Sequence, residues 1–182
     1  PFMFATDNYV GIRPSDTYKF IIFTCPVGKY YSEPVNVKIE EEFVRSADGA
    51  AGYAKAAGNY GASLYPAKLA QAKGFHQLIW TDAKEHKYIE ESGTMNVIFQ
   101  IGEKLITPKS STSILSGITR KSIVKLAKHR GIDVVERQVS VKEVIDALEN
   151  GTLKDAFGAG TAATIAHINT IGYRDKVYQL SP

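Results

Sequence analysis

Apolar runs and alternating apolar and polar residues mark the strands expected in this chain. Residues 18–25 (YKFIIFTC) form a β-rich apolar run, and residues 35–39 (VNVKI) alternate, so both predict strands. The Pro-Val-Gly sequence at 26–28 predicts a turn between them. Further strands are expected over residues 75–80, 95–100, 104–106 and 132–139, and between Gly-rich turns from Ala156 to about Val177. The strands over 95–100 and 104–106 predict a hairpin around Gly102.

Two segments in the middle of the chain carry the signals of helices. Residues 62–73 predict a helix that ends at Gly74. Residues 119–130 predict an amphipathic helix that Gly131 stops. The expected buried face of this second helix consists of Ile123, Leu126 and Ala127.

A third helix has the clearest signals, because Ser140 and Glu143 form a capping box and Asn150-Gly151 ends the segment. Its expected buried stripe consists of Val141, Val144, Ile145 and Leu148. Strands alternate with helices along the chain, but hairpins occur as well. The pattern therefore predicts an α/β fold of the mixed α+β kind rather than a purely parallel sheet.

Composition limits the class of protein. With 182 residues and 44% hydrophobic residues, the chain is one or at most two domains with a sizeable core. It lacks an apolar stretch near the ~18 residues that a membrane span needs. The net charge is +3, but the basic residues are scattered, which argues against nucleic acid as the partner.

Cysteine and histidine usage removes two further possibilities. Cys25 is the single cysteine, so an internal disulfide framework is excluded, and a reducing compartment, the cytoplasm, is favoured. The four histidines do not share the spacing of metal ligands, so no metal site is expected.

Four segments carry candidate chemistry. Lys55 lies in KAAGNYG among small residues, and EESGTMN follows from Glu90. LSGITR (115–120) and GAGTAAT (158–164) are Gly-rich, hydroxyl-bearing turns of the kind that bind phosphate. Taken singly, each also fits a surface lysine, a helix cap or a plain turn. Together, an amine, a tyrosine, a carboxylate and phosphate turns describe a site for pyridoxal 5'-phosphate (PLP).

In this order and spacing, the four segments resemble the class IV, or fold-type IV, aminotransferases, and most closely the branched-chain amino acid aminotransferases. The resemblance runs from Pro1 to about Leu180 and implies the large C-terminal domain of the D-amino-acid-aminotransferase-like fold. It implies that residues 1–33 are first strands and interdomain loop, and that residues 34–182 are the cofactor-binding body. The chain begins at what would be the proline of the family's Tyr-Ile-Arg-Pro strand, so we expect the small N-terminal domain to be absent from it.

The resemblance assigns the groups that hold the cofactor ring. Lys55 is the expected Schiff-base lysine, which also moves a proton between the substrate Cα and the cofactor. Tyr60 is expected to hydrogen-bond the phenolic oxygen of the cofactor. Glu91 is expected to keep the pyridine nitrogen protonated, and its spacing to Thr94 selects it over the adjacent Glu90. Thr94 is expected to contact the face of the cofactor.

Phosphate and substrate contacts are implied in the two later turns. Ile118 and Thr119 are expected to bind the phosphate where a loop enters a helix, because free N–H groups and the helix dipole favour an anion there. Thr161 is expected to reach the phosphate through its hydroxyl. The backbone N–H groups of Ala162 and Thr161 are expected to face the substrate carboxylate.

Three further residue assignments follow from the resemblance. Tyr30 is expected to line the substrate pocket, although Tyr31 competes for this role. Asn96 is expected to be structural. The Cys-x-x-Cys pair of some relatives is replaced by Ala163 and Ala166, which excludes a redox switch there.

The leading hypothesis is a PLP-dependent branched-chain aminotransferase. It would exchange the amino group of leucine, isoleucine or valine with 2-oxoglutarate by a ping-pong Schiff-base mechanism, as a homodimer in the full-length protein. D-amino-acid aminotransferase and aminodeoxychorismate lyase are alternatives with the same fold. An isolated, non-catalytic domain is the alternative of another class, since this chain is expected to be inactive without its N-terminal domain.

Overall fold

The computed structural model describes residues 1–180, so residues 181–182, the end of the expected cofactor-binding body, lie outside the described part. The first strands are β1 (Phe2–Ala5), β2 (Tyr18–Ile21), β3 (Val35–Ile39), β4 (Gln77–Thr81), β5 (Tyr88–Ser92) and β6 (Met95–Ile101). The later strands are β7 (Lys104–Pro108), β8 (Val134–Arg137), β9 (Val139–Ser140), β10 (Leu153–Gly160), β11 (Thr164–Tyr173) and β12 (Lys176–Gln179). The helices are α1 (Ala57–Ala72), α2 (Ile118–His129) and α3 (Val141–Glu149).

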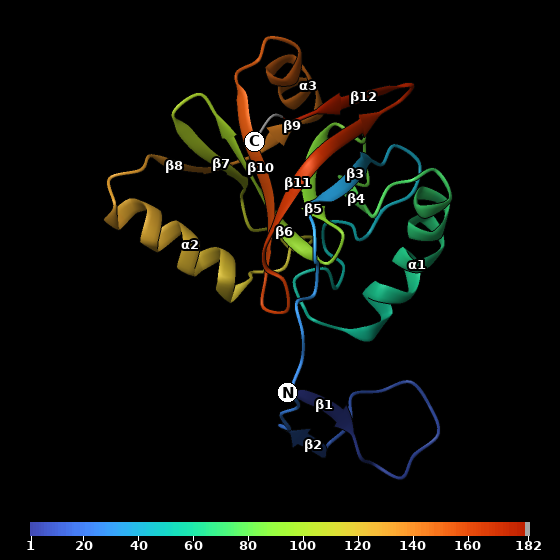
Figure 1. The fold of residues 1–182 in the computed structure, drawn as a ribbon. Coiled ribbons are helices and arrows are strands. Elements are labelled where there is room, and N and C mark those ends of the chain that lie inside the picture. The colour runs from blue at the N-terminus through green and yellow to red at the C-terminus, as the bar shows by residue number, and fades with distance from the viewer. Residues whose placement is uncertain (181–182) are drawn as a thin grey trace.

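A 10-stranded sheet closes on itself to form the body of the molecule (Figure 1). Its neighbour order is β8-β7-β6-β10-β11-β3-β4-β5-β9, with β12 attached to β11. Because β5 also pairs with β6, the strands β6, β10, β11, β3, β4 and β5 complete a ring. β3 is parallel to β4 and β11, whereas the pairs β10–β11 and β6–β7 are antiparallel. The predicted mixed α/β fold is therefore confirmed.

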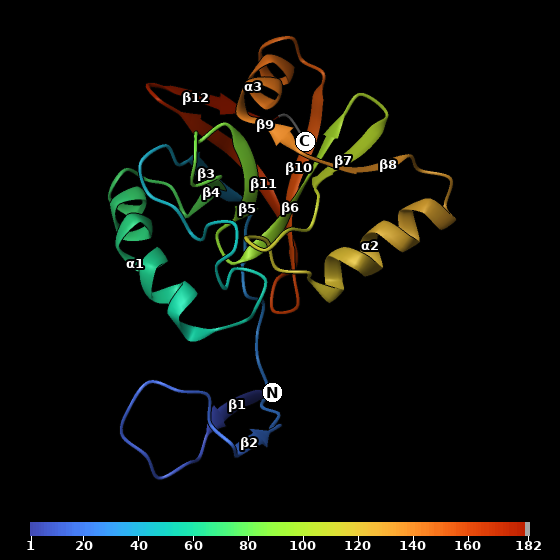
Figure 2. The same ribbon diagram turned by 180° about the vertical axis from the view of Figure 1, so that it is seen from behind.

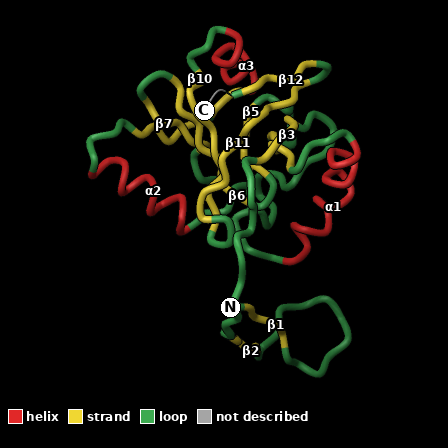
Figure 3. Tube along the Cα trace, viewed as in Figure 1, coloured by secondary structure: helices red, strands yellow, loops and turns green. Residues whose placement is uncertain are grey.

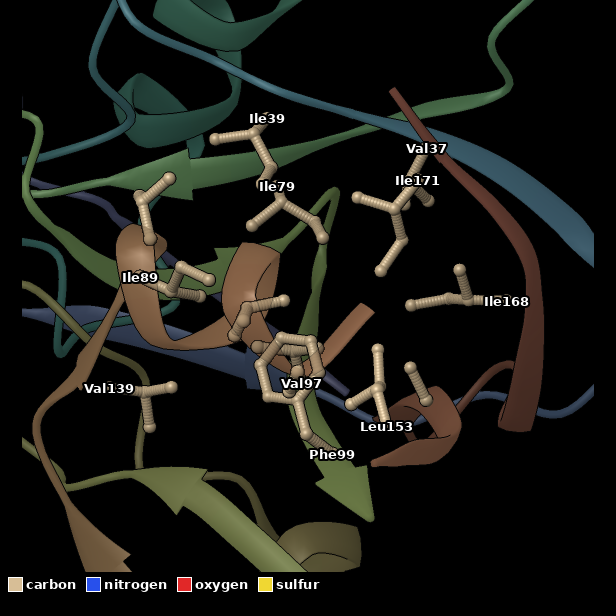
Figure 4. Packing of buried hydrophobic residues seen from close by; sticks show 14 of the residues in the cluster. Val37, Ile39, Ile79, Ile89, Val97, Phe99, Val139, Leu153, Ile168 and Ile171 are labelled. Atoms are coloured by element: carbon tan, nitrogen blue, oxygen red, sulfur yellow. The ribbon is translucent and has the colours of Figure 1, made fainter. Parts of the chain in front are cut away.

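The main hydrophobic core fills the space that these strands enclose, as Figure 4 shows for Val37, Ile79 and Phe99. In β3, the alternation predicted from the sequence is observed, because Val35, Val37 and Ile39 are buried and the residues between them are half-buried. α3 contributes its own apolar side chains to the same core and so closes it at one side.

α1 and α2 lie on opposite sides of this body (Figures 2 and 3). α1 packs through Ala70 on Leu78 and Trp80 of β4. α2 packs on β10, where Ile123 lies against a small cluster that includes Phe157. The two helices therefore flank the sheet, and the loops that lead into them converge at one end of it.

The helix predictions were right in place but not in every detail. α1 begins at Ala57, five residues before the predicted start. The prediction missed these residues because two glycines, which disfavour helix in isolation, lie among them. On α2, the prediction that Leu126 is buried was wrong, because this side chain is 54% exposed. Arg120 and Val124 face inward instead. Arg120 is accommodated because its Nη2 donates to Pro108 O and pairs with Glu136, each at 2.9 Å.

The strand predictions show a similar mixture. The bounds of β3 were correct. The predicted hairpin of β6 and β7 is confirmed, although both strands run further than predicted, and its turn residue Gly102 has φ +57°. The Ser140 cap is confirmed by a 3.1 Å bond from the Glu143 N–H. The strand predicted over 18–25 ends at Ile21, and the one predicted over 132–139 is divided into β8 and β9. β5 was not predicted.

The hairpin of β1 and β2 extends away from the body on a linker (Figure 1). Its large apolar side chains are exposed, among them Met3, Phe20 and Phe23. No helix within residues 1–180 is both long enough and apolar enough to cross a membrane.

Candidate active site

A cavity of about 470 Å³ lies where four loops converge. These loops precede α1, connect β5 to β6, lead into α2 and connect β10 to β11. The lining residues are Tyr30, Lys55, Glu91, Thr94, Met95, Asn96, Leu115, Ser116, Gly117, Ile118, Thr119, Ala159, Gly160, Thr161, Ala162 and Ala163. The cavity therefore brings together all the residues selected from the sequence except Tyr60, which lies directly behind Lys55.

Lys55 projects from the loop before α1. Its Nζ donates to the hydroxyl of Tyr60, in the first turn of α1, at 3.1 Å. Asn59, in the same turn, holds the loop by donating from Nδ2 to Ala51 O at 2.8 Å and Ala54 O at 2.9 Å. The helix start thus fixes both the backbone before the lysine and the hydroxyl beside its amine.

Glu91 lies on β5, where strand pairing fixes its position between Trp80 of β4 and Asn96 of β6. The residue is 3% exposed. Its Oε1 accepts from the Leu115 N–H at 2.6 Å and from Asn96 Nδ2 at 3.3 Å, and its Oε2 pairs with Arg45 Nε at 3.3 Å. The carboxylate is thus held from three directions at the wall of the cavity.

Burial raises the pKa of Glu91 to about 7, although Arg45, the Leu115 N–H and Lys55 each act in the opposite direction. A carboxylate with this pKa carries its full charge only when a positive group lies close to it. Glu91 can therefore hold a cationic ring nitrogen, since that cation would stabilise its ionised form.

Glu90 occupies the neighbouring position on β5 and does not line the cavity. Its Oε1 accepts a short hydrogen bond from Ser113 Oγ. Successive side chains of a strand point to opposite faces, so only one of the two glutamates can reach the cavity.

The N-terminus of α2 also lines the cavity. The preceding residue, Gly117, has no side chain, and a Cβ there would overlap Asn96 Oδ1. Ile118 and Thr119 begin the helix, where no side chain caps the backbone. Unpaired N–H groups and the helix dipole make this end suited to an anion.

The β10–β11 turn supplies the third wall with Thr161 and Ala162. Small residues allow the turn to pack closely on Met95, because a Cβ at Gly158 would lie 2.6 Å from Met95 Cε. Thr164 ends the turn with φ +58°, in the left-handed region. Thr161 is exposed and lines the same cavity as Thr119.

The adjacent tyrosines Tyr30 and Tyr31 occupy different environments. Tyr30 lines the cavity, whereas Tyr31 lies beyond it and accepts from Gln77 Nε2 at 3.1 Å. Burial raises the pKa of Tyr31. The rings contact edge to face, 4.8 Å apart.

Arg45 is the main site residue that sequence reasoning missed. It lies in the loop after β3, far along the chain from Glu91, and no motif marks it. Asn96 was given only a structural role, yet it contacts Glu91 and lines the cavity. The signal available for this contact was the short separation of Asn96 from Glu91, on either side of the turn at Gly93.

The cavity suits a ligand that carries both an anionic group and a cationic nitrogen. The α2 N-terminus would bind the anion, and Glu91 the nitrogen. Lys55 adds a primary amine to the same cavity, which is a nucleophile toward carbonyl carbon. Among the described residues, 1–180, no group of acidic, histidine or cysteine side chains has the arrangement of a metal site.

Comparison with known proteins gives the same family from sequence and from fold. The family described as amino-transferase class IV matches residues 3–171. "Branched-chain-amino-acid aminotransferase 2" of Bacillus subtilis (strain 168) is 45% identical over 100% of this chain and 51% of its own length. The chain thus spans about half the length of the curated relatives it matches.

Two solved structures extend the likeness to the fold. The branched-chain aminotransferase of Thermoproteus uzoniensis, solved with norvaline, has a TM-score of 0.72 and 29% identity over 87% of this chain and 50% of its own. The PLP form of the branched-chain amino acid aminotransferase of Thermobaculum terrenum has a TM-score of 0.66 and 27% identity over 76% of this chain and 43% of its own. The fold-type IV architecture is therefore confirmed, and the chain belongs to the class IV aminotransferase family.

Proposed function

We propose that this chain is the cofactor-binding part of a branched-chain amino acid aminotransferase. The reaction transfers the amino group of L-leucine, L-isoleucine or L-valine to 2-oxoglutarate, with PLP as cofactor. The observation that carries the proposal is the single cavity that holds Lys55, Glu91 and the N-terminus of α2. The names of the relatives at 45% and 42% identity support the substrate class.

The residues present fit PLP. Gly117 lets the loop before α2 pack directly on Asn96, and Ile118 and Thr119, at the uncapped helix N-terminus, would hold the phosphate. Glu91 would hold the pyridine nitrogen, because its buried carboxylate needs a nearby cation to stay ionised. Tyr60 would hold the phenolic oxygen beside Lys55.

Bound PLP supplies an aldehyde that condenses with primary amines and a protonated ring that withdraws electrons from the carbon next to the substrate nitrogen. The chain then has to move a proton. The Lys55 amine would take the proton from the substrate Cα and deliver it to the cofactor. Its hydrogen bond to Tyr60 orients the amine for this transfer.

The β10–β11 turn, which forms the third wall of the cavity, would orient the substrate. The backbone N–H groups of Thr161 and Ala162 would bind the α-carboxylate, and the Thr161 hydroxyl would add a bond to the phosphate. Thr94, at the β5–β6 turn, would contact the cofactor face. The ring of Tyr30 would line the substrate side chain, which suits an apolar branched chain.

The decisive experiment adds PLP to the full-length protein, reduces it with borohydride and maps the labelled peptide. Label on Lys55 and the loss of absorbance near ~400 nm on reduction are expected. Label elsewhere, or no binding, would overturn the proposal. Turnover of L-leucine against D-alanine then separates the branched-chain reaction from that of a D-amino-acid aminotransferase, and release of pyruvate from aminodeoxychorismate tests the lyase.

We further propose that residues 1–33 belong to first strands and an interdomain loop and that the rest forms the large C-terminal domain. The exposed apolar hairpin of β1 and β2 supports this division, since such faces are covered in a complete protein. A cytoplasmic homodimer is the proposed state, and sedimentation of the full-length protein tests the dimer.

A further inference from the structure

We propose that Arg45, Glu90 and Glu91 form one buried charge unit behind the cavity. In it, Arg45 is a positioning residue that stabilises the ionised form of Glu91 and aims it at the ligand, while Glu90 competes for the charge of the same guanidinium. The consequence for the cofactor rests on the proposed function, but the charge unit itself does not.

The geometry of Arg45 carries the first part. Its side chain is 9% exposed, that of Glu91 is 4% exposed, and they pair at 3.3 Å through Nε and Oε2. Nη2 donates to Gly52 O at 3.3 Å and to Ser113 O. These carbonyls fix the guanidinium plane, so the positive charge cannot turn away from Glu91.

The pairing of Arg45 with Glu91 is mainly electrostatic. Arg45 Nε has no hydrogen-bond partner among residues 1–180, although Glu91 Oε2 lies within ion-pair distance. A through-space charge interaction is therefore the main means by which Arg45 acts on this carboxylate, and burial strengthens such an interaction.

Glu90 carries the second part. It is 8% exposed, its Oε1 accepts from Ser113 Oγ, and its Oε2 has no partner in the described residues. A buried carboxylate with an unpartnered oxygen is expensive to ionise and takes up a proton instead. Burial accordingly raises the pKa of Glu90.

Different charged groups act on the ionisation of Glu91 and of Glu90. Glu91 faces the cations Arg45 and Lys55, which stabilise its charge, and the Glu90 carboxylate, which opposes it. Around Glu90, Asp48 and Asp82 oppose ionisation, whereas Arg45 and the hydrogen bond from Ser113 favour it. One guanidinium cannot balance two buried carboxylates, so the ionisation of Glu90 and that of Glu91 are coupled through Arg45.

The test follows the Glu91 carboxyl carbon by ¹³C NMR during a pH titration of the full-length protein without PLP, with Glu91→Gln to assign the signal. Arg45→Met is expected to raise the Glu91 pKa by about one unit or more, because a nearby opposite charge is lost. Arg45→Lys should recover most of that shift. Glu90→Gln should lower the Glu91 pKa, because a neighbouring like charge is lost.

Controls make each outcome decisive. Arg174→Met removes an exposed ion pair with Glu41 and should change nothing. Should Arg45→Met fail to fold, the ¹⁵Nε signal of Arg45 in the unmodified protein decides, because it must move with the same midpoint as the Glu91 carboxyl. No such movement, or an unchanged Glu91 pKa in Glu90→Gln, would overturn the charge unit.

Affinity for PLP is the second readout. Arg45→Met should weaken PLP binding about tenfold, corresponding to about 1.4 kcal/mol, and Glu90→Gln should not. An unmodified protein that does not bind PLP would refute the proposed function and leave the titration result standing. Equal PLP affinity in Arg45→Met and the unmodified protein would refute the role of Arg45 toward the ligand.

Discussion

The two sides of the cavity are built in opposite ways. Lys55 stands exposed on a loop, with Tyr60 Oη as the partner of its amine. Glu91 is buried on a central strand and is contacted by Arg45, Asn96 and the Leu115 N–H. The first group has room to move, whereas the second is fixed by the sheet.

This difference matches what each group has to do. An amine that forms and releases a bond and then moves a proton needs freedom, which a loop provides. A carboxylate that must stay charged opposite a ring needs a rigid and dry position. Substitutions on the loop side should therefore change chemistry with little effect on stability, and those on the strand side should change both.

The largest effect is expected for Lys55→Ala. Removal of the amine should abolish turnover and the cofactor absorbance near ~400 nm, since no other amine lies in the cavity lining. The melting temperature should hardly change, because the side chain is exposed. Lys68→Ala, an exposed lysine on α1, is the matched control, and retention of the absorbance band in Lys55→Ala would contradict the assignment.

Glu91 should give the next largest effect, on the pH dependence of stability without cofactor. Its folded pKa, about 7, lies above the value of 4.5 for the unfolded chain, so the folded state holds more protons between these values. The contribution of Glu91 to the free energy of unfolding is complete below about pH 4.5. It falls by up to about 1.4 kcal/mol per pH unit as the pH rises to about 7.

Urea unfolding from pH 5 to 8 measures that loss, with Glu91→Gln beside the unmodified protein. The variant should lack the decline of about 3 kcal/mol that Glu91 contributes, while all other groups titrate in both proteins. Parallel curves for the two proteins would show that Glu91 is not buried as an acid with a raised pKa.

Gly117→Ala should have an intermediate effect at the anion end. The new Cβ overlaps Asn96 Oδ1, so the loop before α2 must shift, at a cost of about 1–3 kcal/mol in stability. Binding of PLP should weaken by about tenfold or more, because the N–H groups of Ile118 and Thr119 move with the loop. Gly28→Ala is the control, since a Cβ there meets no atom within 4 Å.

The same contrast explains what the sequence predicts well. Local patterns located β3, the β6–β7 hairpin and the Ser140 cap, because alternation, turn residues and caps act within a few positions. The spacing of the four motifs also led to a set of residues that line one cavity. Apart from Glu91 on β5, these residues lie in loops and turns or at the start of a helix, where sequence signals are strong.

Contacts between distant segments escaped prediction. Arg45 meets Glu91 only because β3, β4 and β5 are neighbours in the ring, and no periodicity encodes that order. Arg120 was not among the residues predicted for the buried face of α2, yet it is buried and paired with Pro108 O and Glu136. The early start of α1 was obscured by Gly58 and Gly61, whose weak helix propensity is outweighed by tertiary packing.

Tyr60→Phe should show the smallest effect and tests the loop side directly. The change removes the hydroxyl that Lys55 Nζ meets at 3.1 Å and keeps the ring, so the fold should be unaffected. A hydrogen bond at an exposed position is replaced by water, so the loss should be about 1 kcal/mol, or roughly fivefold in kcat/KM. A loss as large as that of Lys55→Ala would mean that the tyrosine is as fixed and as essential as Glu91. In that case, the contrast between a mobile and a rigid side of the cavity would not hold.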